Sequence, residues 1–214
     1  MVALGLIGSP RPEGNTATAV RDVLAGLALE GYSADEVLLS SCEILPIGDC
    51  QACVESGCCD LNDHFEELMQ RLYAADLLVI GTPLYWYGPS GQLKQFIDRW
   101  SCLLDREEET FRQRMRGKPA AIVVAQGERG FYEVAPCLQM LEWTLRYLDM
   151  PVLGRIVVVG HARGNYSADV VQRAAVHDTA RRLASAQPTD LTPPWFHLRY
   201  APGDSLGGAF SPIE

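Results

Sequence analysis

The sequence predicts an α/β protein built on one doubly wound, five-stranded parallel sheet with helices on both faces. Short apolar runs alternate with longer amphipathic segments along the chain, which is typical of parallel strands joined by helices. The apolar runs are continuous rather than alternating, as in Leu77-Leu78-Val79-Ile80, so we expect both faces of the sheet to be covered. Five such strand–helix units with right-handed crossovers fit a three-layer domain with strand order 2-1-3-4-5.

The strands are expected at the apolar runs. These cover residues 2–8, 34–39, 76–82, 120–125 and 152–159. Valine, leucine, isoleucine and alanine make up most of these runs, and short runs of this kind are typical of buried strands.

The helices are expected at the amphipathic segments, which cover residues 15–30, 63–73, 90–104, 132–148 and 167–185. In the first segment the apolar side chains recur at helical spacing on one side. The segment 63–73 has the same period, and its apolar stripe is formed by Phe65, Leu68, Met69 and Leu72.

Two segments depart from this alternation. Residues 42–62 form an irregular stretch after the second strand, and connections this long are usually functional or mobile. Residues 188–214 are rich in proline and glycine yet contain aromatic side chains such as Trp195 and Phe196, which is not typical of polar disorder. We expect one domain over residues 1–187 and a C-terminal extended arm that packs on it or on a neighbouring subunit.

Charge and composition exclude several classes of partner. The 214 residues include 18 basic and 27 acidic side chains, a net charge of −9. Nucleic acid and anionic membranes repel such a chain, so neither is expected as a partner. There is no apolar run of about 18 residues to cross a membrane, and no secretory signal is recognised. We therefore expect a cytoplasmic protein, whose seven cysteines are free thiols or bind a metal.

The loop after the first strand is predicted to bind a phosphate group. In a sheet of this order, ligands bind beyond the carboxyl ends of the first and third strands. Residues 8–17 combine two glycines, small polar side chains and the cation Arg11 just before a helix. The unpaired N–H groups of a helix start favour an anion, and Ser9, Asn15 and Thr16 add donors. Asn15 or Thr16 could also cap the helix.

The spacing in this loop excludes two other nucleotide signatures. Five residues separate Gly8 from Gly14 and no lysine follows, so the P-loop pattern of triphosphate sites is absent. The G-x-G-x-x-G pattern of dinucleotide sites is absent as well. A single terminal phosphate is the expected guest, and an ordinary helix-capping turn is the alternative.

Three consecutive aromatic residues, Tyr85, Trp86 and Tyr87, follow the third strand at the same predicted edge. Aromatic faces stack on heteroaromatic rings, so we expect a flat ligand beside them. Packing at a subunit contact is the alternative. The two interpretations are compatible if the ligand site lies at a dimer interface. A phosphate site next to an aromatic loop suits flavin mononucleotide (FMN).

Both loops resemble those of the NAD(P)H-dependent FMN reductases. Residues 8–16, GSPRPEGNT, are similar to the family's G-S-x-R-x-x-G-N-T/S loop. Residues 83–99, PLYWYGPSGQLKQFIDR, are similar to its segment with the pattern P-x-Y-W, then K-x-F-x-D-R. The alternation of strands and helices extends the resemblance over about residues 2–185.

The resemblance implies a flavodoxin-like fold, bound FMN, and homodimers or homotetramers. It implies an oxidoreductase that transfers hydride from NADPH or NADH through FMN to a flavin, a quinone or a similar small acceptor. The FMN phosphate would be held by Ser9, Arg11, Asn15, Thr16 and Ala17. The isoalloxazine would be lined by Pro83, Leu84, Tyr85 and Trp86, with Gly127 near the ring edge.

Other assignments follow from the same resemblance. Since the cofactor performs the chemistry, no side chain is expected to act as a catalytic acid or base. Asp98 and Arg99 are expected to be structural. Arg11, Arg129 or Arg163 could meet the 2′-phosphate of NADPH, so the choice between NADPH and NADH stays open.

Cysteines 50, 53, 58 and 59 are clustered like metal ligands. The pattern is similar to that of the iron–sulfur flavoproteins, a branch of the same family, but Ile47 stands where the first ligand is expected. We expect free thiols or a disulfide and assign no metal ligand, while an iron–sulfur cluster or zinc stays the alternative. A flavodoxin-type electron carrier and a non-catalytic ligand sensor are the other functions considered.

Overall fold

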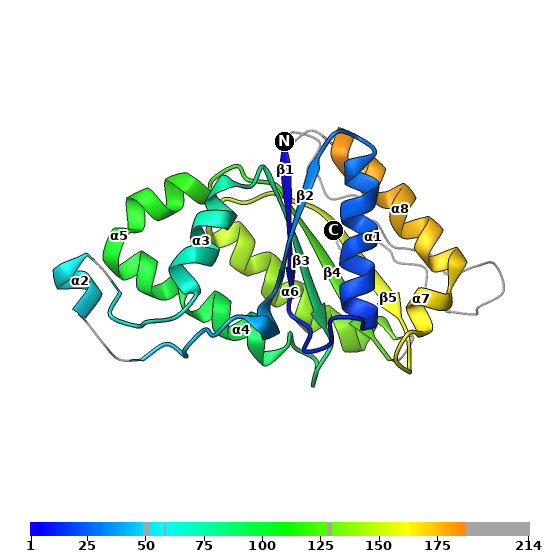
Figure 1. Ribbon diagram of the computed structural model, residues 1–214, viewed down its shortest axis with the longest axis horizontal. Coiled ribbons are helices and arrows are strands. Elements are labelled where there is room, and N and C mark those ends of the chain that lie inside the picture. Colours follow the sequence, from blue (N-terminus) through cyan, green and yellow to red (C-terminus); the bar gives the residue numbers. More distant parts are fainter. Residues whose placement is uncertain (49–51, 58, 128–129, 187–214) are drawn as a thin grey trace.

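A computed structural model describes residues 1–48, 52–57, 59–127 and 130–186. Five parallel strands form one sheet in the order β2-β1-β3-β4-β5, which confirms the predicted flavodoxin-like topology (Figure 1). The strands are β1 (Val2–Ile7), β2 (Ser33–Leu38), β3 (Leu77–Pro83), β4 (Ala120–Gln126) and β5 (Val152–Val159).

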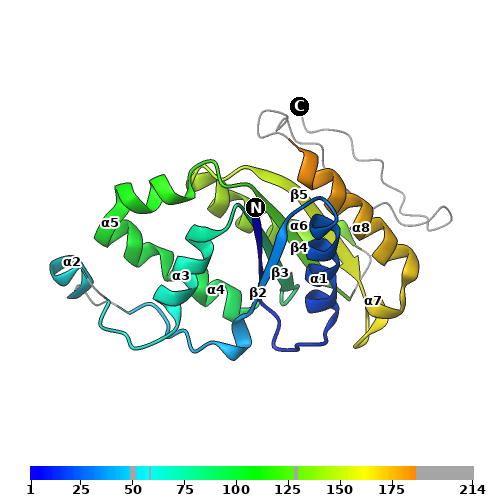
Figure 2. The ribbon, with the colours of Figure 1, turned by 45° about the horizontal axis from the view of Figure 1, so that its top comes forward.

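Helices cover both faces of this sheet, as Figures 1 and 2 show. One face is covered by α1 (Asn15–Ala28), α7 (Asn165–Ala168) and α8 (Val170–Ser185). The other is covered by α3 (Phe65–Ala74), α4 (Gly91–Asp98), α5 (Trp100–Met115) and α6 (Phe131–Tyr147), while the short helix α2 (Ala52–Ser56) lies beyond them.

Each face has its own apolar core, and this explains why the interior strands β1, β3 and β4 are almost entirely apolar, whereas the edge strand β2 also carries Ser33, Asp35 and Glu36. In β3, Leu78 and Ile80 belong to the core beneath α3–α6, whereas Leu77 and Val79 belong to the core beneath α1 and α8. Successive side chains of a strand point to opposite faces. A strand between two helical layers therefore needs apolar residues at every position.

The helix expected at residues 90–104 was wrong in its extent. Two helices, α4 and α5, meet at Arg99, and α5 continues to Met115. The Arg99 side chain is fully buried and bonds to groups far away in sequence, so the break coincides with a tertiary contact that local periodicity does not reveal. The expected helix 167–185 is likewise divided, because the Asp169 side chain accepts a hydrogen bond from Gln172 N and caps α8.

The described parts of the long segment, residues 42–48, 52–57 and 59–62, are irregular, as expected, apart from the turn of helix at α2. The expected boundary at residue 187 and the arm 188–214 lie outside the described residues. No helix in the described ranges is both long and apolar enough to span a membrane.

Candidate functional site

Gly8 brings the loops after β1 and β3 into contact at the carboxyl edge of the sheet. Its N–H donates to the Gly81 carbonyl over 2.7 Å. A Cβ on Gly8 would lie only 2.8 Å from the Leu93 Cβ and 3.0 Å from the Ser90 Oγ. Only glycine lets the β1 loop pass this close to the start of α4.

The start of α1 has free N–H groups facing this loop. Gly14 occupies the N-cap position and no side chain caps the helix, so the expected capping by Asn15 or Thr16 was wrong. Within the described ranges, no acceptor bonds to the N–H groups of residues 15–17. Such groups and the helix dipole attract an anion, which fits the phosphate of FMN.

The other predicted phosphate ligands surround this helix start. Ser9 is buried, and its Oγ accepts a 3.1 Å hydrogen bond from Arg11 N. The Arg11 side chain is exposed, and none of the described residues bonds to its guanidinium. Thr16 is buried in the first turn of α1 and is followed by the buried Ala17. These residues place polar groups and one free cation around one backbone cradle.

Asn15 differs from the other members of this group, because its side chain is already engaged. Its Nδ2 donates to the carbonyls of Gly160 and Ala162, both over 3.0 Å, and its Oδ1 accepts from Tyr166 N over 3.2 Å. Only its backbone N–H is left for a phosphate. The role of the side chain as a phosphate ligand stays a prediction.

The aromatic loop after β3 forms a tight turn. Tyr85 and Gly88 exchange two backbone hydrogen bonds of 3.0 Å. Trp86 and Tyr87 between them have positive φ values of 50° and 66°, a type I′ geometry that normally selects Asn and Gly. Left-handed backbone at bulky residues is strained, and strain of this kind clusters at functional sites.

The predicted ring-lining residues meet at this edge but differ in exposure. Pro83 and Leu84 are half-buried, and Leu84 N donates to the Ala125 carbonyl over 2.8 Å, which joins the β3 loop to the end of β4. Gly127 follows two residues later and has open space beside it. Tyr85 is exposed and Trp86 is 95% exposed, so the Trp86 ring extends away from the chain's own core.

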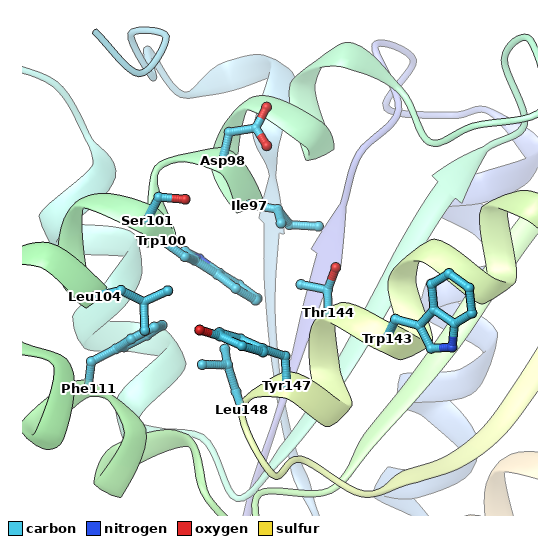
Figure 3. Close-up of a pocket in the computed structure, with 10 residues that line it drawn as sticks. All are labelled: Ile97, Asp98, Trp100, Ser101, Leu104, Phe111, Trp143, Thr144, Tyr147 and Leu148. Carbon is cyan, nitrogen blue, oxygen red and sulfur yellow. The ribbon is translucent and has the colours of Figure 1, made fainter. Parts of the chain in front are cut away.

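A cavity of about 360 Å³ lies away from these loops, between α4, α5 and α6 (Figure 3). Its walls are mainly apolar, with Trp100, Leu104 and Phe111 on one side and Trp143 and Tyr147 on the other. None of the predicted site residues lines it. Trp143 and Tyr147 are largely exposed, which is typical of a surface that another chain covers.

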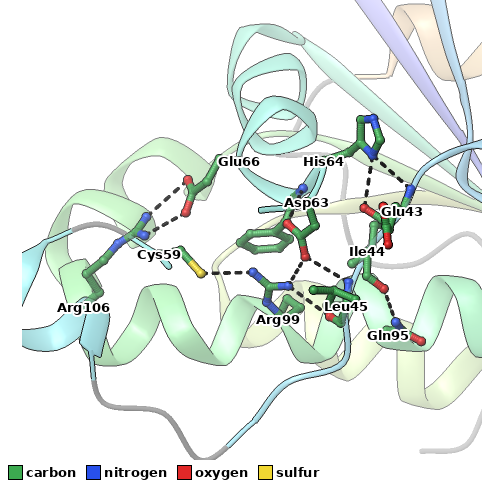
Figure 4. Close-up of polar contacts among 11 residues, drawn as sticks. Glu43, Ile44, Leu45, Cys59, Asp63, His64, Glu66, Gln95, Arg99 and Arg106 are labelled. Atoms are coloured by element: carbon green, nitrogen blue, oxygen red, sulfur yellow. Dashed lines mark hydrogen bonds and ion pairs between the residues drawn. The ribbon is translucent and has the colours of Figure 1, made fainter. Parts of the chain in front are cut away.

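Arg99 anchors the long segment 42–62, as expected for a structural residue (Figure 4). Its Nη1 lies 2.5 Å from Asp63 Oδ2 and donates to the Leu45 carbonyl over 3.0 Å. Phe65 stacks on the guanidinium, 4.4 Å from ring centre to Cζ. Asp98 pairs with Lys94 instead.

Cys59 and Cys102 also contact Arg99. Arg99 Nη2 lies 3.4 Å from Cys59 Sγ. The same guanidinium also forms a hydrogen bond with the Cys102 thiol. Burial raises the pKa of Cys102, and Arg99 offsets only part of that effect. No local pattern in the sequence points to Cys102, because it lies on α5, far from the clustered cysteines in sequence.

Comparison with known proteins decides the family. The family model for NADPH-dependent FMN reductases matches residues 1–164. The chain belongs to this family. FMN and a nicotinamide nucleotide are therefore confirmed as the cofactor and cosubstrate at the level of the family.

Individual family members point in two directions. The chain is 31% identical to Bacillus subtilis YwqN, which is named as an NAD(P)H-dependent FMN-containing oxidoreductase, over 82% of this chain and 92% of YwqN. It is 39% identical to the iron–sulfur flavoprotein MJ1083 of Methanocaldococcus jannaschii, over 46% of this chain and 51% of that protein. A solved Bacillus subtilis structure described as Trp repressor binding protein superposes with a TM-score of 0.64 at 25% identity, covering 86% of this chain and 98% of that one.

Some relatives are named as iron–sulfur flavoproteins, and only part of the clustered cysteines lies within the described residues, so the absence of a metal ligand there stays a prediction. Ile47 occupies the place of the expected first ligand. The cationic Arg99 contacts both Cys59 and Cys102, so each of these thiols already has a polar partner within the chain. Among the described residues, no group of three or more His, Cys, Asp or Glu side chains could hold a metal ion. Cys50 and Cys58 lie outside the described residues.

Proposed function

We propose that this member of the FMN reductase family transfers hydride from NADPH or NADH, through bound FMN, to a small acceptor such as a flavin or a quinone. The observation that carries the proposal is the uncapped start of α1 beside the strained aromatic turn at Trp86 and Tyr87. One feature suits a phosphate and the other suits a flat ring.

The chain's own residues would divide the work between the two ends of the cofactor. Backbone N–H groups of Asn15, Thr16 and Ala17 would hold the phosphate, together with Ser9 and Arg11. The protein as a whole is acidic, with a net charge of −9, and this charge repels a phosphate. Several local donors are therefore needed to bind the phosphate.

At the other end, Pro83, Leu84, Tyr85 and Trp86 would line the isoalloxazine, with Gly127 near its edge. FMN, when bound, supplies the capacity to accept and release hydride. The protein would orient the ring and exclude water from it. No described side chain is proposed as a catalytic acid or base.

We also propose that the protein is a cytoplasmic homo-oligomer, a dimer or a tetramer. The exposed aromatic side chains Trp143 and Tyr147, beside the cavity between α4, α5 and α6, support a subunit contact on this face. The arm at residues 188–214 is a second candidate for such a contact.

The first test is the visible spectrum of the purified full-length protein, followed by steady-state oxidation of NADPH and NADH with FMN or a quinone as acceptor. We expect flavin absorbance and turnover with at least one nucleotide. Arg11→Gln should weaken FMN binding more than riboflavin binding, because riboflavin lacks the phosphate. Arg182→Gln, an exposed arginine paired with Asp178 on α8, is the matched control and should change neither.

The alternative functions give different results. Bound FMN without turnover of either nucleotide would favour a flavodoxin-type electron carrier. A protein that binds no flavin on titration would favour a non-catalytic sensor. Turnover that depends on stoichiometric iron and acid-labile sulfide would favour an iron–sulfur flavoprotein.

A further inference from the structure

Among the residues that the structure describes, two arginines have no partner, whereas the other cations are engaged. In the described ranges, every other lysine and arginine contacts a carboxylate, a backbone carbonyl or an aromatic ring. Arg11 and Arg163 have no such contact, and both are exposed. An acidic protein that leaves two guanidinium groups unpaired provides sites for an anion.

The two free arginines lie on loops that meet at the start of α1. Arg11 precedes this helix in the β1 loop, and Arg163 lies in the loop between β5 and α7. Figures 1 and 2 both show α7 beside the first turn of α1. Sequence separation hides this proximity, because about 150 residues lie between them.

Asn15 attaches the second loop to the first helix. Its side chain bonds to Gly160 O, Ala162 O and Tyr166 N, so it binds the loop on both sides of Arg163. Gly160 has to be a glycine here, since a Cβ would collide with the Asn15 amide.

The loop is also braced internally. Ala162 N donates to Asn165 Oδ1 over 2.5 Å, and Ser167 Oγ donates to the Gly164 carbonyl over 2.8 Å. Gly164 adopts a φ of 75°, a conformation that favours glycine. The loop thus holds the backbone of Arg163 in a fixed place next to the first residue of α1, while its side chain stays exposed.

We propose that Arg163 binds a phosphate monoester of the nucleotide ligands, and that Asn15 positions it by holding the β5–α7 loop. This proposal rests on the proposed function. Two phosphate monoesters can reach the site under that function: the 5′-phosphate of FMN and the 2′-phosphate of NADPH. Asn15 is then a positioning residue, since its side-chain amide serves the loop.

The test is Arg163→Gln in the full-length protein, with two pairs of ligands. Dissociation constants for FMN and riboflavin measure the contribution of the 5′-phosphate, and KM values for NADPH and NADH measure that of the 2′-phosphate. A charge-assisted hydrogen bond predicts a loss of about tenfold or more in one of the two ratios. Arg182→Gln should leave both ratios unchanged.

The role of Asn15 is tested by Asn15→Ala, alone and combined with Arg163→Gln. If Asn15 acts through Arg163, the single substitution reduces the same ratio, and the double variant loses little more than either single variant. A purely structural Asn15 would lower stability and leave both ratios unchanged, which would overturn the positioning role.

The two levels of the proposal fail in different ways. Intact flavin binding and turnover, with both ratios unchanged in Arg163→Gln, would overturn the role of Arg163 alone. A protein that binds neither flavin nor nucleotide would overturn the proposed function and this inference with it.

Discussion

Arg99 and Asp63 form an ion pair that solvent does not reach. Their Nη1 and Oδ2 atoms are 2.5 Å apart, and their side chains are 0% and 1% exposed. The pair joins the break between α4 and α5 to the segment 42–62, because Asp63 also accepts a hydrogen bond from Leu45 N and Arg99 donates to Leu45 O.

Removal of one partner of this pair should destabilise the fold strongly. Asp63→Ala leaves the Arg99 charge buried without a counterion, so we expect the free energy of unfolding to fall by about 3–5 kcal/mol. Urea denaturation followed by circular dichroism measures it. Asp98→Ala is the control, since the Asp98–Lys94 pair is 39% and 47% exposed and should cost at most about 1 kcal/mol. Equal losses in both variants would contradict the assignment.

Stability should fall at acidic pH. Burial acts to raise the pKa of Asp63, but hydrogen bonds from Leu45 N, Phe65 N and Arg99 outweigh it and lower the pKa below its usual value. A lowered pKa in the folded state contributes stability above the unfolded value of about 3.9, and this is lost as the pH falls through the folded value. The pKa of Asp22 is lowered in the same way: burial acts to raise it, but hydrogen bonds from Arg173 and Tyr166 outweigh this effect.

Urea midpoints at pH 5 and pH 3 measure this dependence. Asp63→Asn should flatten it, since the variant has no carboxylate to protonate. Neutralisation of the exposed Glu109 to Gln should leave the dependence as it is. A wild-type midpoint that does not change between the two pH values would disprove the prediction.

Gly8 should not tolerate a methyl group. A Cβ there would lie 2.8 Å from Leu93 Cβ, so Gly8→Ala should cost about 1–3 kcal/mol of stability and weaken FMN binding by displacing the loop. Gly91→Ala is the matched control, because nothing lies within 4 Å of its Cβ position and alanine favours a helix. Thermal unfolding and FMN titration of both variants test the contrast. An unaffected Gly8→Ala would show that the loops do not need this close approach.

Two substitutions in the aromatic turn should distinguish the effect of backbone strain on stability from the effect of ring contact on flavin binding. Tyr87→Gly removes a bulky residue from positive φ and should stabilise the fold by about 1 kcal/mol. Trp86→Ala leaves its backbone strained but removes the ring, and should weaken FMN and riboflavin binding alike, by about three- to tenfold. Flavin titration and urea denaturation of both variants measure this. Unchanged flavin affinity in Trp86→Ala would remove Trp86 from the proposed ring-binding surface.

The purified protein should contain flavin but no stoichiometric iron or acid-labile sulfide. The missing ligand at Ile47 and the contacts of Arg99 with Cys59 and Cys102 are the reasons. Iron analysis, sulfide analysis and the visible spectrum measure it on protein purified without oxygen. A cluster in stoichiometric amount, lost in Cys59→Ser and kept in Cys137→Ser, would refute this reasoning.

Local sequence predicted the strands and most helices because their signals are local. Both faces of β3 are buried, so a continuous apolar run identified it. The glycines and the helix start of the β1 loop likewise predicted an anion site from neighbouring residues alone. The breaks at Arg99 and Asp169 were missed, since they depend on side-chain contacts rather than on periodicity.

The sequence by itself determined the fold class and the family, and it located the two loops proposed to bind the ligand, because each is specified by contiguous residues. Only the tertiary structure decided that the Asn15 side chain serves the β5–α7 loop, that Arg99 joins Asp63 to Cys59 and Cys102, and that Trp86 is strained and exposed. These relationships arise where distant segments pack together, and packing sets side-chain partners that no local pattern encodes.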